Sequence, residues 1–412
     1  RGEDHGLVTN YRLPATSWQP SCHHRRVFSR RLPPNVESNA LSRAVEALHA
    51  EGVPFADLTE SNPTRAGIVY PDALLDSLTN PAALRYEPRP FGLPSARRAV
   101  ADDQGRRGVT VDPAHVVLTA STSEAYSWLF KLLCNPGDGV LVPRPSYPLF
   151  DHLTALECVR AHPYAIEYHG QWEMDVESLA AAPLDIRALL VVSPNNPTGS
   201  FMSAEEFQRV VTLCGQRKWA LIVDEVFADY PLEASRPLTD MAVRSEVLCF
   251  TLAGLSKTIG LPQLKLGWCI VGGPAAERDA ALAALEVIAD SYLSVGTPVQ
   301  VATPALLSSG ASIRASIQGR IGRNLSALRA VAAGFPASEV LRADGGWSAV
   351  LRIPSTRGEE PLVLDLLRAE RILVHPGYFF DFPRETYLVV SLLPPEAVFA
   401  DAVGRLLRSV QC

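Results

Sequence analysis

The spacing of hydrophobic residues changes along the chain, and it predicts which segments are helices and which are strands. Residues 39–51 place Leu41, Val45 and Leu48 on one face of a helix. From about residue 92, segments with a helical pattern alternate with short apolar runs. The helical segments are 93–103, 123–133 and 204–216, and the apolar runs are 115–119, 139–142, 188–192, 220–223, 247–251 and 266–271. Short runs of Val, Ile and Leu between helices are typical of buried, mostly parallel strands.

The order of these elements predicts two domains. The alternation indicates a large α/β domain at residues 70–308, with a mostly parallel sheet flanked by helices. Residues 309–412 indicate a small α+β domain. Its expected elements are a long helix, two shorter helices and two strands, at 310–333, 361–369, 396–409, 347–353 and 387–392. We expect residues 31–69 to contribute to the small domain, and residues 1–30 to form a flexible arm.

Composition and charge exclude several classes of function. The chain has 412 residues, which is too many for one small core and agrees with two domains. Its net charge of −6 gives no basic field that would attract nucleic acid. No apolar run approaches the roughly 18 residues that a membrane helix needs, so no membrane partner is expected.

The seven cysteines do not suggest a disulfide framework. Their number is odd, no Cys-x-x-Cys occurs, and most lie inside apolar stretches. Buried free thiols in a reducing compartment are therefore favoured, and no metal-ligand spacing stands out. The arginine-rich start of the chain is not followed by the apolar segment of a secretory signal, so we expect a cytoplasmic protein.

Two charged residues end predicted buried strands. Lys257 lies in Gly254-Leu-Ser-Lys257, where an amine flanked by small residues can form an imine with a carbonyl group. Asp224 ends the apolar run at 220–223. A buried carboxylate beside a pyridine nitrogen keeps that nitrogen protonated, so that the ring withdraws electrons from a carbanion. Taken alone, each residue has an ordinary interpretation, as a strand-ending lysine and as a capping or paired carboxylate.

Two polar loops follow other predicted strands. Ser193-Pro-Asn-Asn196-Pro-Thr-Gly199 is either a simple turn or a loop that places Asn196 where α/β sheets bind ligands. Ser121, Thr122 and Ser123 join a strand to a helix. Hydroxyl groups at a helix start are usually N-caps, and the same geometry also binds phosphate.

In this order and spacing, the four segments resemble the fold type I enzymes that use pyridoxal 5′-phosphate (PLP), specifically the class I/II aminotransferases of the aspartate aminotransferase superfamily. The resemblance covers roughly residues 31–410. It implies that PLP is bound as an imine to Lys257, which also moves the substrate proton. It further implies Asp224 at the pyridinium nitrogen, Asn196 at the phenolic oxygen, an amino acid substrate, and a homodimer with shared active sites.

The resemblance also implies roles for residues whose motifs are looser. Those at the cofactor are Ser121, Thr122 and Ser123 around the phosphate, Tyr147 stacked on the ring, Lys265 at the phosphate, and Tyr86 and Thr297 near the phosphate of the neighbouring subunit. Asn62 resembles a residue on the substrate side. Tyr147 can equally be a core tyrosine and Thr297 an N-cap, so both interpretations stay open.

Three positions depart from the family pattern. Phe227 replaces a tyrosine that donates to the phenolic oxygen, and Tyr230 is a candidate to compensate. Lys265 replaces an arginine and lacks its bidentate fork. Val389 replaces the arginine that binds the substrate carboxylate. We considered Arg89, Arg352 and Arg65 as its substitutes.

The favoured hypothesis is a PLP-dependent aminotransferase. The alternative is a PLP enzyme of another reaction type, such as β- or γ-elimination, γ-replacement or C–C bond formation in secondary metabolism, because Val389 and Phe227 weaken the case for ordinary transamination. A non-catalytic regulator is disfavoured because the N-terminal arm is too short for a DNA-binding module. The sequence leaves open the amino donor, the acceptor, and the group that binds the carboxylate.

Overall fold

The computed structural model describes residues 29–32, 38–233, 241–354 and 357–411. All but the last two residues of the predicted arm at 1–30 lie outside this part of the chain. None of the helices in the described part is both long and apolar enough to cross a membrane.

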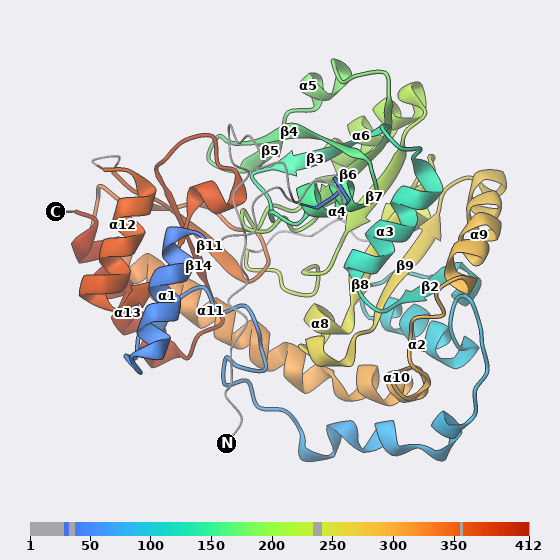
Figure 1. Cartoon of the computed structure of the whole chain (residues 1–412), viewed down its shortest axis with the longest axis horizontal. Coiled ribbons are helices and arrows are strands. Elements are labelled where there is room, and N and C mark those ends of the chain that lie inside the picture. Colours follow the sequence, from blue (N-terminus) through green and yellow to red (C-terminus); the bar gives the residue numbers. More distant parts are fainter. Residues whose placement is uncertain (1–28, 33–37, 234–240, 355–356, 412) are drawn as a thin grey trace.

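An eight-stranded sheet forms the larger part of the molecule (Figure 1). Its strands follow the order β2 (Val116–Thr119), β9 (Gly267–Gly272), β8 (Cys249–Gly254), β7 (Ala220–Asp224), β6 (Ile186–Val192), β3 (Gly139–Arg144), β4 (Arg160–Tyr168) and β5 (Trp172–Met174). The five strands from β8 to β4 run parallel, whereas β9 is antiparallel to both neighbours and β5 is antiparallel to β4. The predicted α/β fold with a mostly parallel sheet is confirmed.

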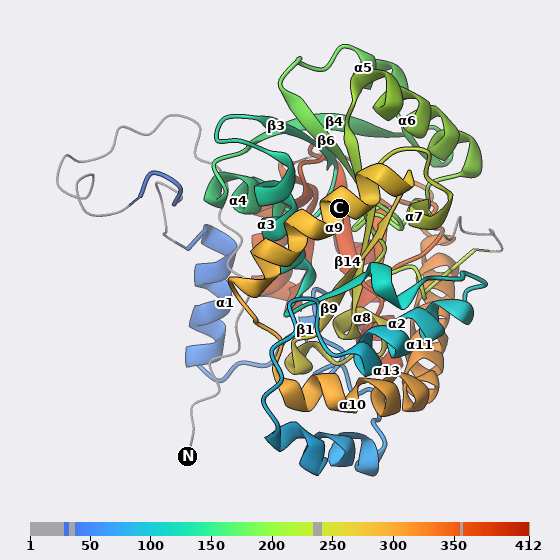
Figure 2. The ribbon, with the colours of Figure 1, turned by 90° about the vertical axis from the view of Figure 1, so that its right-hand side faces the viewer.

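Helices cover both faces of this sheet because successive side chains of a buried strand point to opposite sides. In β6, Leu189 and Val191 belong to one hydrophobic core, and Leu190 belongs to the other. The first core includes side chains of α2 (Pro94–Gly105), α6 (Ala204–Arg217) and α10 (Thr297–Ser309). The second includes side chains of α3 (Thr122–Leu133), α4 (Phe150–Leu156) and α9 (Ala275–Asp290). Figure 2 shows α9 crossing close to α3.

A second group of elements lies beside the large sheet. Its four antiparallel strands follow the order β10 (Glu339–Val340), β11 (Ser348–Arg352), β14 (Tyr387–Ser391) and β13 (His375–Pro376). The long helix α11 (Ala311–Ala332) leads to it from α10 (Figure 1). Helices α12 (Glu359–Asp365) and α13 (Glu396–Ser409) pack around it, with a π-helical turn at Leu366–Glu370.

The N-terminal segment joins this second group. Helix α1 (Ala40–Ala50) begins after Asn39, whose side chain accepts a hydrogen bond from the Ser42 amide, and it packs against α12 (Figure 1). Strand β1 (Ala56–Asp57) pairs in parallel with β12 (Ile372–Leu373). The predicted domain boundaries at 69 and 308 stay predictions.

Candidate active site

Lys257 follows strand β8 directly, in the short helix α8 (Leu255–Thr258). A Cβ atom at Gly254 would lie 3.0 Å from the Gly267 Cα, so glycine lets the end of β8 approach β9 closely. The Lys257 Nζ lies over two rings, 4.9 Å from the centroid of Trp347 and 5.4 Å from that of Phe227. Burial lowers the pKa of Lys257 to about 8, although the carboxylates of Asp224 and Glu60 oppose this shift. This amine is therefore easier to deprotonate than an ordinary lysine.

Asp224 ends the neighbouring strand β7 and is buried, with 7% of its surface exposed. Its Oδ2 accepts a hydrogen bond of 2.7 Å from the Tyr126 hydroxyl, and its Oδ1 accepts one of 3.0 Å from the Val226 amide. Burial nevertheless raises the pKa of Asp224 to about 6. Both of these donors are uncharged, so they do not neutralise the carboxylate. A protonated ring nitrogen would do so.

Asn196 lies in the loop that follows strand β6. The turn needs Gly199, which has a φ of +73° and where a Cβ atom would lie 2.6 Å from the Gly345 carbonyl oxygen. The Asn196 Oδ1 accepts a hydrogen bond of 3.3 Å from the Ser348 hydroxyl on β11. This loop therefore links the large sheet to the smaller one beside the site.

The loop at 121–123 begins helix α3. The Ser121 hydroxyl accepts a hydrogen bond from the Glu124 amide at 3.2 Å, so Ser121 is the N-cap of α3. Thr122 and Ser123 form the first turn, where backbone N–H groups have no partner within the helix and favour an anion. Gly267 on β9 packs closely against this turn, since a Cβ atom there would lie 3.1 Å from the Thr122 nitrogen. The arrangement suits a phosphate.

Tyr147 and Asn196 line a cavity between the two sheets. The other lining residues are Thr59, Ser61, Pro148, Ser348, His375, Phe379, Phe380, Val389 and Ser391. Burial raises the pKa of Tyr147 to about 12, so its hydroxyl stays neutral. The cavity reaches Val389 but contains none of the arginines considered from the sequence.

Those arginines are exposed and paired with nearby carboxylates. Arg352 pairs with Glu339 across strands β10 and β11, because strand alternation buries Leu351 and turns Arg352 outward. Arg65 lies 3.3 Å from Glu60.

Arg89 pairs with Glu87 and lines a separate hollow together with Tyr86 and Thr297. Tyr86 and Thr297, the two residues expected near the neighbouring subunit, thus lie at one hollow, apart from the cavity at Val389.

Three other expectations can be compared with the structure. Lys265 is exposed, with a left-handed backbone at φ 49°. The Asn62 side chain accepts hydrogen bonds from the amide and hydroxyl of Thr64. Tyr230 does not take over from the missing tyrosine, because its hydroxyl donates to the Lys257 carbonyl oxygen at 2.6 Å.

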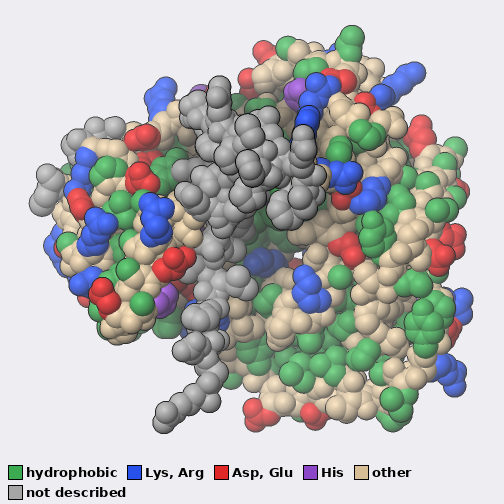
Figure 3. Space-filling model, in the orientation of Figure 1, with side chains coloured by type: hydrophobic (Ala, Val, Ile, Leu, Met, Phe, Trp, Pro, Cys, Tyr) green, Lys and Arg blue, Asp and Glu red, His purple; other side chains and the backbone are tan. Residues whose placement is uncertain are grey.

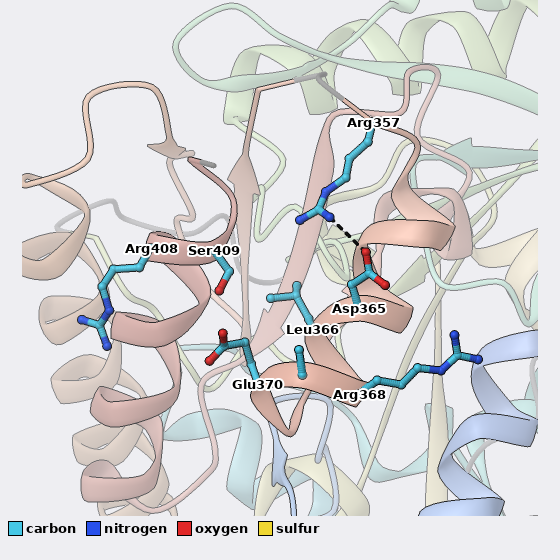
Figure 4. Close-up of a pocket in the computed structure, with 8 residues that line it drawn as sticks. Arg357, Asp365, Leu366, Arg368, Glu370, Arg408 and Ser409 are labelled. Carbon is cyan, nitrogen blue, oxygen red and sulfur yellow. Dashed lines mark hydrogen bonds and ion pairs between the residues drawn. The ribbon is translucent and has the colours of Figure 1, made fainter.

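A further hollow lies between the π-helical turn and α13 (Figure 4). Arg357, Arg368 and Arg408 surround it together with Asp365 and Glu370, and Arg357 pairs with Asp365 at 3.0 Å. None of the predicted site residues lines it, so the site at Lys257 remains the candidate active site.

Known proteins resemble the chain over most of its length. The family model described as aminotransferase class I and II matches residues 68–400. An alanine aminotransferase of Mycobacterium tuberculosis is 28% identical over 417 residues, which cover 97% of this chain and 96% of that protein. The glutamate-pyruvate aminotransferase AlaA of Haemophilus influenzae is 28% identical, with 88% and 92% covered. The crystal structure of an aminotransferase from Escherichia coli matches with a TM-score of 0.82 at 24% identity, covering 90% of this chain and 95% of that one.

Proposed function

Because the chain belongs to the class I and II aminotransferases, a family of PLP-dependent enzymes, we propose that it transfers the amino group of an amino acid with Lys257 as its catalytic residue. The observation that carries this proposal is the placement of Lys257 and Asp224. A partly buried amine with a lowered pKa follows β8, and a buried carboxylate ends the adjacent parallel strand β7. The family match favours this reaction over the other PLP chemistries.

The residues around Lys257 fit the cofactor. Asp224 would hold the pyridine nitrogen in its protonated form, and the start of α3 at Thr122 would bind the phosphate. Asn196 would donate to the phenolic oxygen, and Tyr147 would lie against the ring. When bound, PLP withdraws electrons from the substrate Cα. The remaining predicted contacts, by Lys265 and by Tyr86 and Thr297 of a second copy, are part of the same proposal.

Lys257 would move the proton at the substrate Cα. A general base works best when its pKa lies near the working pH, and burial brings the pKa of Lys257 to about 8. The hydrogen bond from Tyr230 to the Lys257 carbonyl fixes the backbone from which the amine reaches the site. The rings of Trp347 and Phe227 would restrict the positions that the Lys257 Nζ can take and would exclude water from the side of the amine that they cover.

We further propose a homodimer that shares its active sites. Tyr86 and Leu293 line the hollow with Thr297 and are 76% and 36% exposed, and Leu84, two residues before Tyr86, is 90% exposed. Figure 3 shows hydrophobic side chains gathered on this lower part of the molecule. A second copy that covers them would bring Tyr86 toward its partner's site.

The cytoplasm is the proposed location. All five cysteines in the described part of the chain are unbridged, which suits a reducing compartment.

A half-reaction assay tests the proposed reaction. Alanine and glutamate are the first donors to mix with the holoenzyme, because the relatives' names contain them. The expected products are the 2-oxo acid and pyridoxamine phosphate, and Lys257→Ala should form neither. Borohydride reduction followed by peptide mapping should label Lys257. Labelling of another lysine, or elimination products without amino transfer, would contradict the proposal.

A further inference from the structure

The cavity at Val389 contains a polar residue that the sequence motifs do not indicate. Strands β13 and β14 pair antiparallel, with His375 directly opposite Val389. Residues opposite each other on neighbouring strands project from the same face of the sheet. Both side chains line the cavity that also holds Tyr147 and Asn196. His375 therefore lies beside the position where related enzymes have their carboxylate-binding arginine.

His375 has an unused hydrogen-bonding atom, unlike several of its neighbours. Three hydroxyl groups in the cavity already donate hydrogen bonds within the protein. They belong to Thr59, Ser348 and Ser391, which bond to Asp57, Asn196 and the backbone oxygen of Glu60 at 2.6, 3.3 and 2.6 Å. By contrast, the Nδ1 of His375 is shielded from solvent, and no donor or acceptor in the described residues bonds to it. A buried polar atom without a partner is costly unless a ligand supplies one.

The surroundings keep this imidazole uncharged. Burial lowers the pKa of His375 to about 4, against the opposing effect of the Asp57 carboxylate. The rings of Phe379 and Phe380 lie 5.5 and 5.6 Å from the imidazole ring. At neutral pH the ring therefore offers one N–H donor and one acceptor, without a positive charge.

We infer that the imidazole of His375 binds the carboxyl end of the substrate through a neutral hydrogen bond, so that the site accepts amino acid amides as well as amino acids. The inference rests on the proposed function, which places the amino group of the same substrate at Lys257. An arginine forms two charge-assisted hydrogen bonds with a substrate carboxylate. An uncharged amide group on the substrate cannot form such bonds, so an arginine would favour the carboxylate. A single neutral donor bonds to the carbonyl oxygen of either group.

Calorimetric titration of the holoenzyme with propionate and with propionamide tests this inference. Neither compound has the amino group needed for reaction, so the measurement is independent of amino transfer. The two dissociation constants should agree within about threefold, because a neutral hydrogen bond distinguishes the two compounds weakly. His375→Ala should weaken the binding of both by about fivefold, the effect of one such bond.

Matched variants separate the hydrogen bond from a structural role. The amide of His375→Asn lies near the Nδ1 position and should restore binding, whereas His375→Gln reaches the Nε2 position and should not. Val389→Arg should tighten the binding of propionate by about tenfold or more and leave propionamide unchanged.

Three results would overturn the inference. They are a wild-type preference for propionate above about tenfold, unchanged binding of both compounds by a folded His375→Ala, and the absence of binding by the wild type. A failed half-reaction with intact binding of both compounds would instead count against the proposed function alone.

Discussion

At the scale of single residues, Asp224 shows how a site can reduce the stability of the protein that carries it. Its carboxylate accepts hydrogen bonds from Tyr126 and Val226, yet burial still raises its pKa to about 6 from an ordinary value of 3.8. Between these two pH values the folded protein binds more protons than the unfolded chain does. The contribution of Asp224 to folding stability therefore falls as the pH rises from about 4 to about 6.

The apoprotein of Asp224→Asn should consequently be more stable than the wild-type apoprotein at neutral pH. The gain should be about 2–3 kcal/mol in the free energy of unfolding and should disappear near pH 4. Urea unfolding at the two pH values measures it. The same variant should bind PLP more weakly, because it cannot pair with a ring cation. If Asp224→Asn is less stable than the wild type at neutral pH, the existing contacts of Asp224 already offset the cost of burying its charge.

Tyr126→Phe should weaken PLP binding without unfolding the protein. The change removes the donor 2.7 Å from the Asp224 Oδ2 and makes the carboxylate harder to keep charged. We expect the dissociation constant of PLP to rise by about tenfold, which corresponds to about 1.4 kcal/mol. Tyr164→Phe is the matched control, since Tyr164 is also buried and its hydroxyl donates to the Leu190 carbonyl at 2.9 Å. Equal losses in both variants would indicate a general packing effect.

The sequence predicts some site residues and misses others for a physical reason. Lys257 and Asn196 follow buried strands and Asp224 ends one, and the ends of neighbouring parallel strands must meet at one edge of the sheet. Tyr126 and His375 carry no such signal. Tyr126 reaches Asp224 from helix α3, and His375 lies in a strand of only two residues. Their positions depend on packing between elements that are distant in the sequence.

At the scale of secondary-structure elements, predictions succeeded where the hydrophobic pattern was regular. Helix α1, predicted at 39–51, spans Ala40–Ala50 and buries Leu41, Val45 and Leu48. Strand β4 was missed because it contains Pro163 and leaves much of its surface exposed. Helix α10 was missed because it contains Pro298 and Pro304 and its buried face includes the polar residues Gln300 and Thr303. In both segments, burial by neighbouring elements overrides a weak local pattern.

The contact between β9 and the start of α3 gives an element-scale prediction. Gly267→Ala should displace the turn at Thr122, because its Cβ atom would lie 3.0–3.1 Å from three atoms of β2 and the turn. We expect PLP to bind at least about tenfold more weakly, since the phosphate depends on the N–H groups of this turn. Gly215→Ala in α6 is the control, because its nearest neighbour would be 3.6 Å away. Unchanged PLP binding by Gly267→Ala would show that the turn at Thr122 does not bind the phosphate.

At the scale of the whole molecule, one chain exposes residues that the proposed site requires. Tyr86 and Thr297 line a hollow at the surface rather than the cavity at Val389. Exposed hydrophobic residues flank that hollow, with Leu293 within it and Tyr292 next to it in sequence. A large apolar surface on a single chain usually marks an interface. This exposure supports the proposed homodimer, in which a second copy would complete each site.

Leu84→Glu should therefore weaken both the dimer and its sites. The Leu84 side chain is 90% exposed in the single chain, and burying a charge there without a partner costs several kcal/mol. Analytical ultracentrifugation should show monomers at concentrations where the wild type is dimeric, and PLP binding should weaken in parallel. Leu184→Glu changes a side chain that is 92% exposed between α5 (Val176–Ala180) and β6, outside this surface, and should leave both properties unchanged. If the Leu84→Glu protein stays dimeric, the interface lies elsewhere on the surface. If it is a monomer with intact PLP binding, each chain completes its own site.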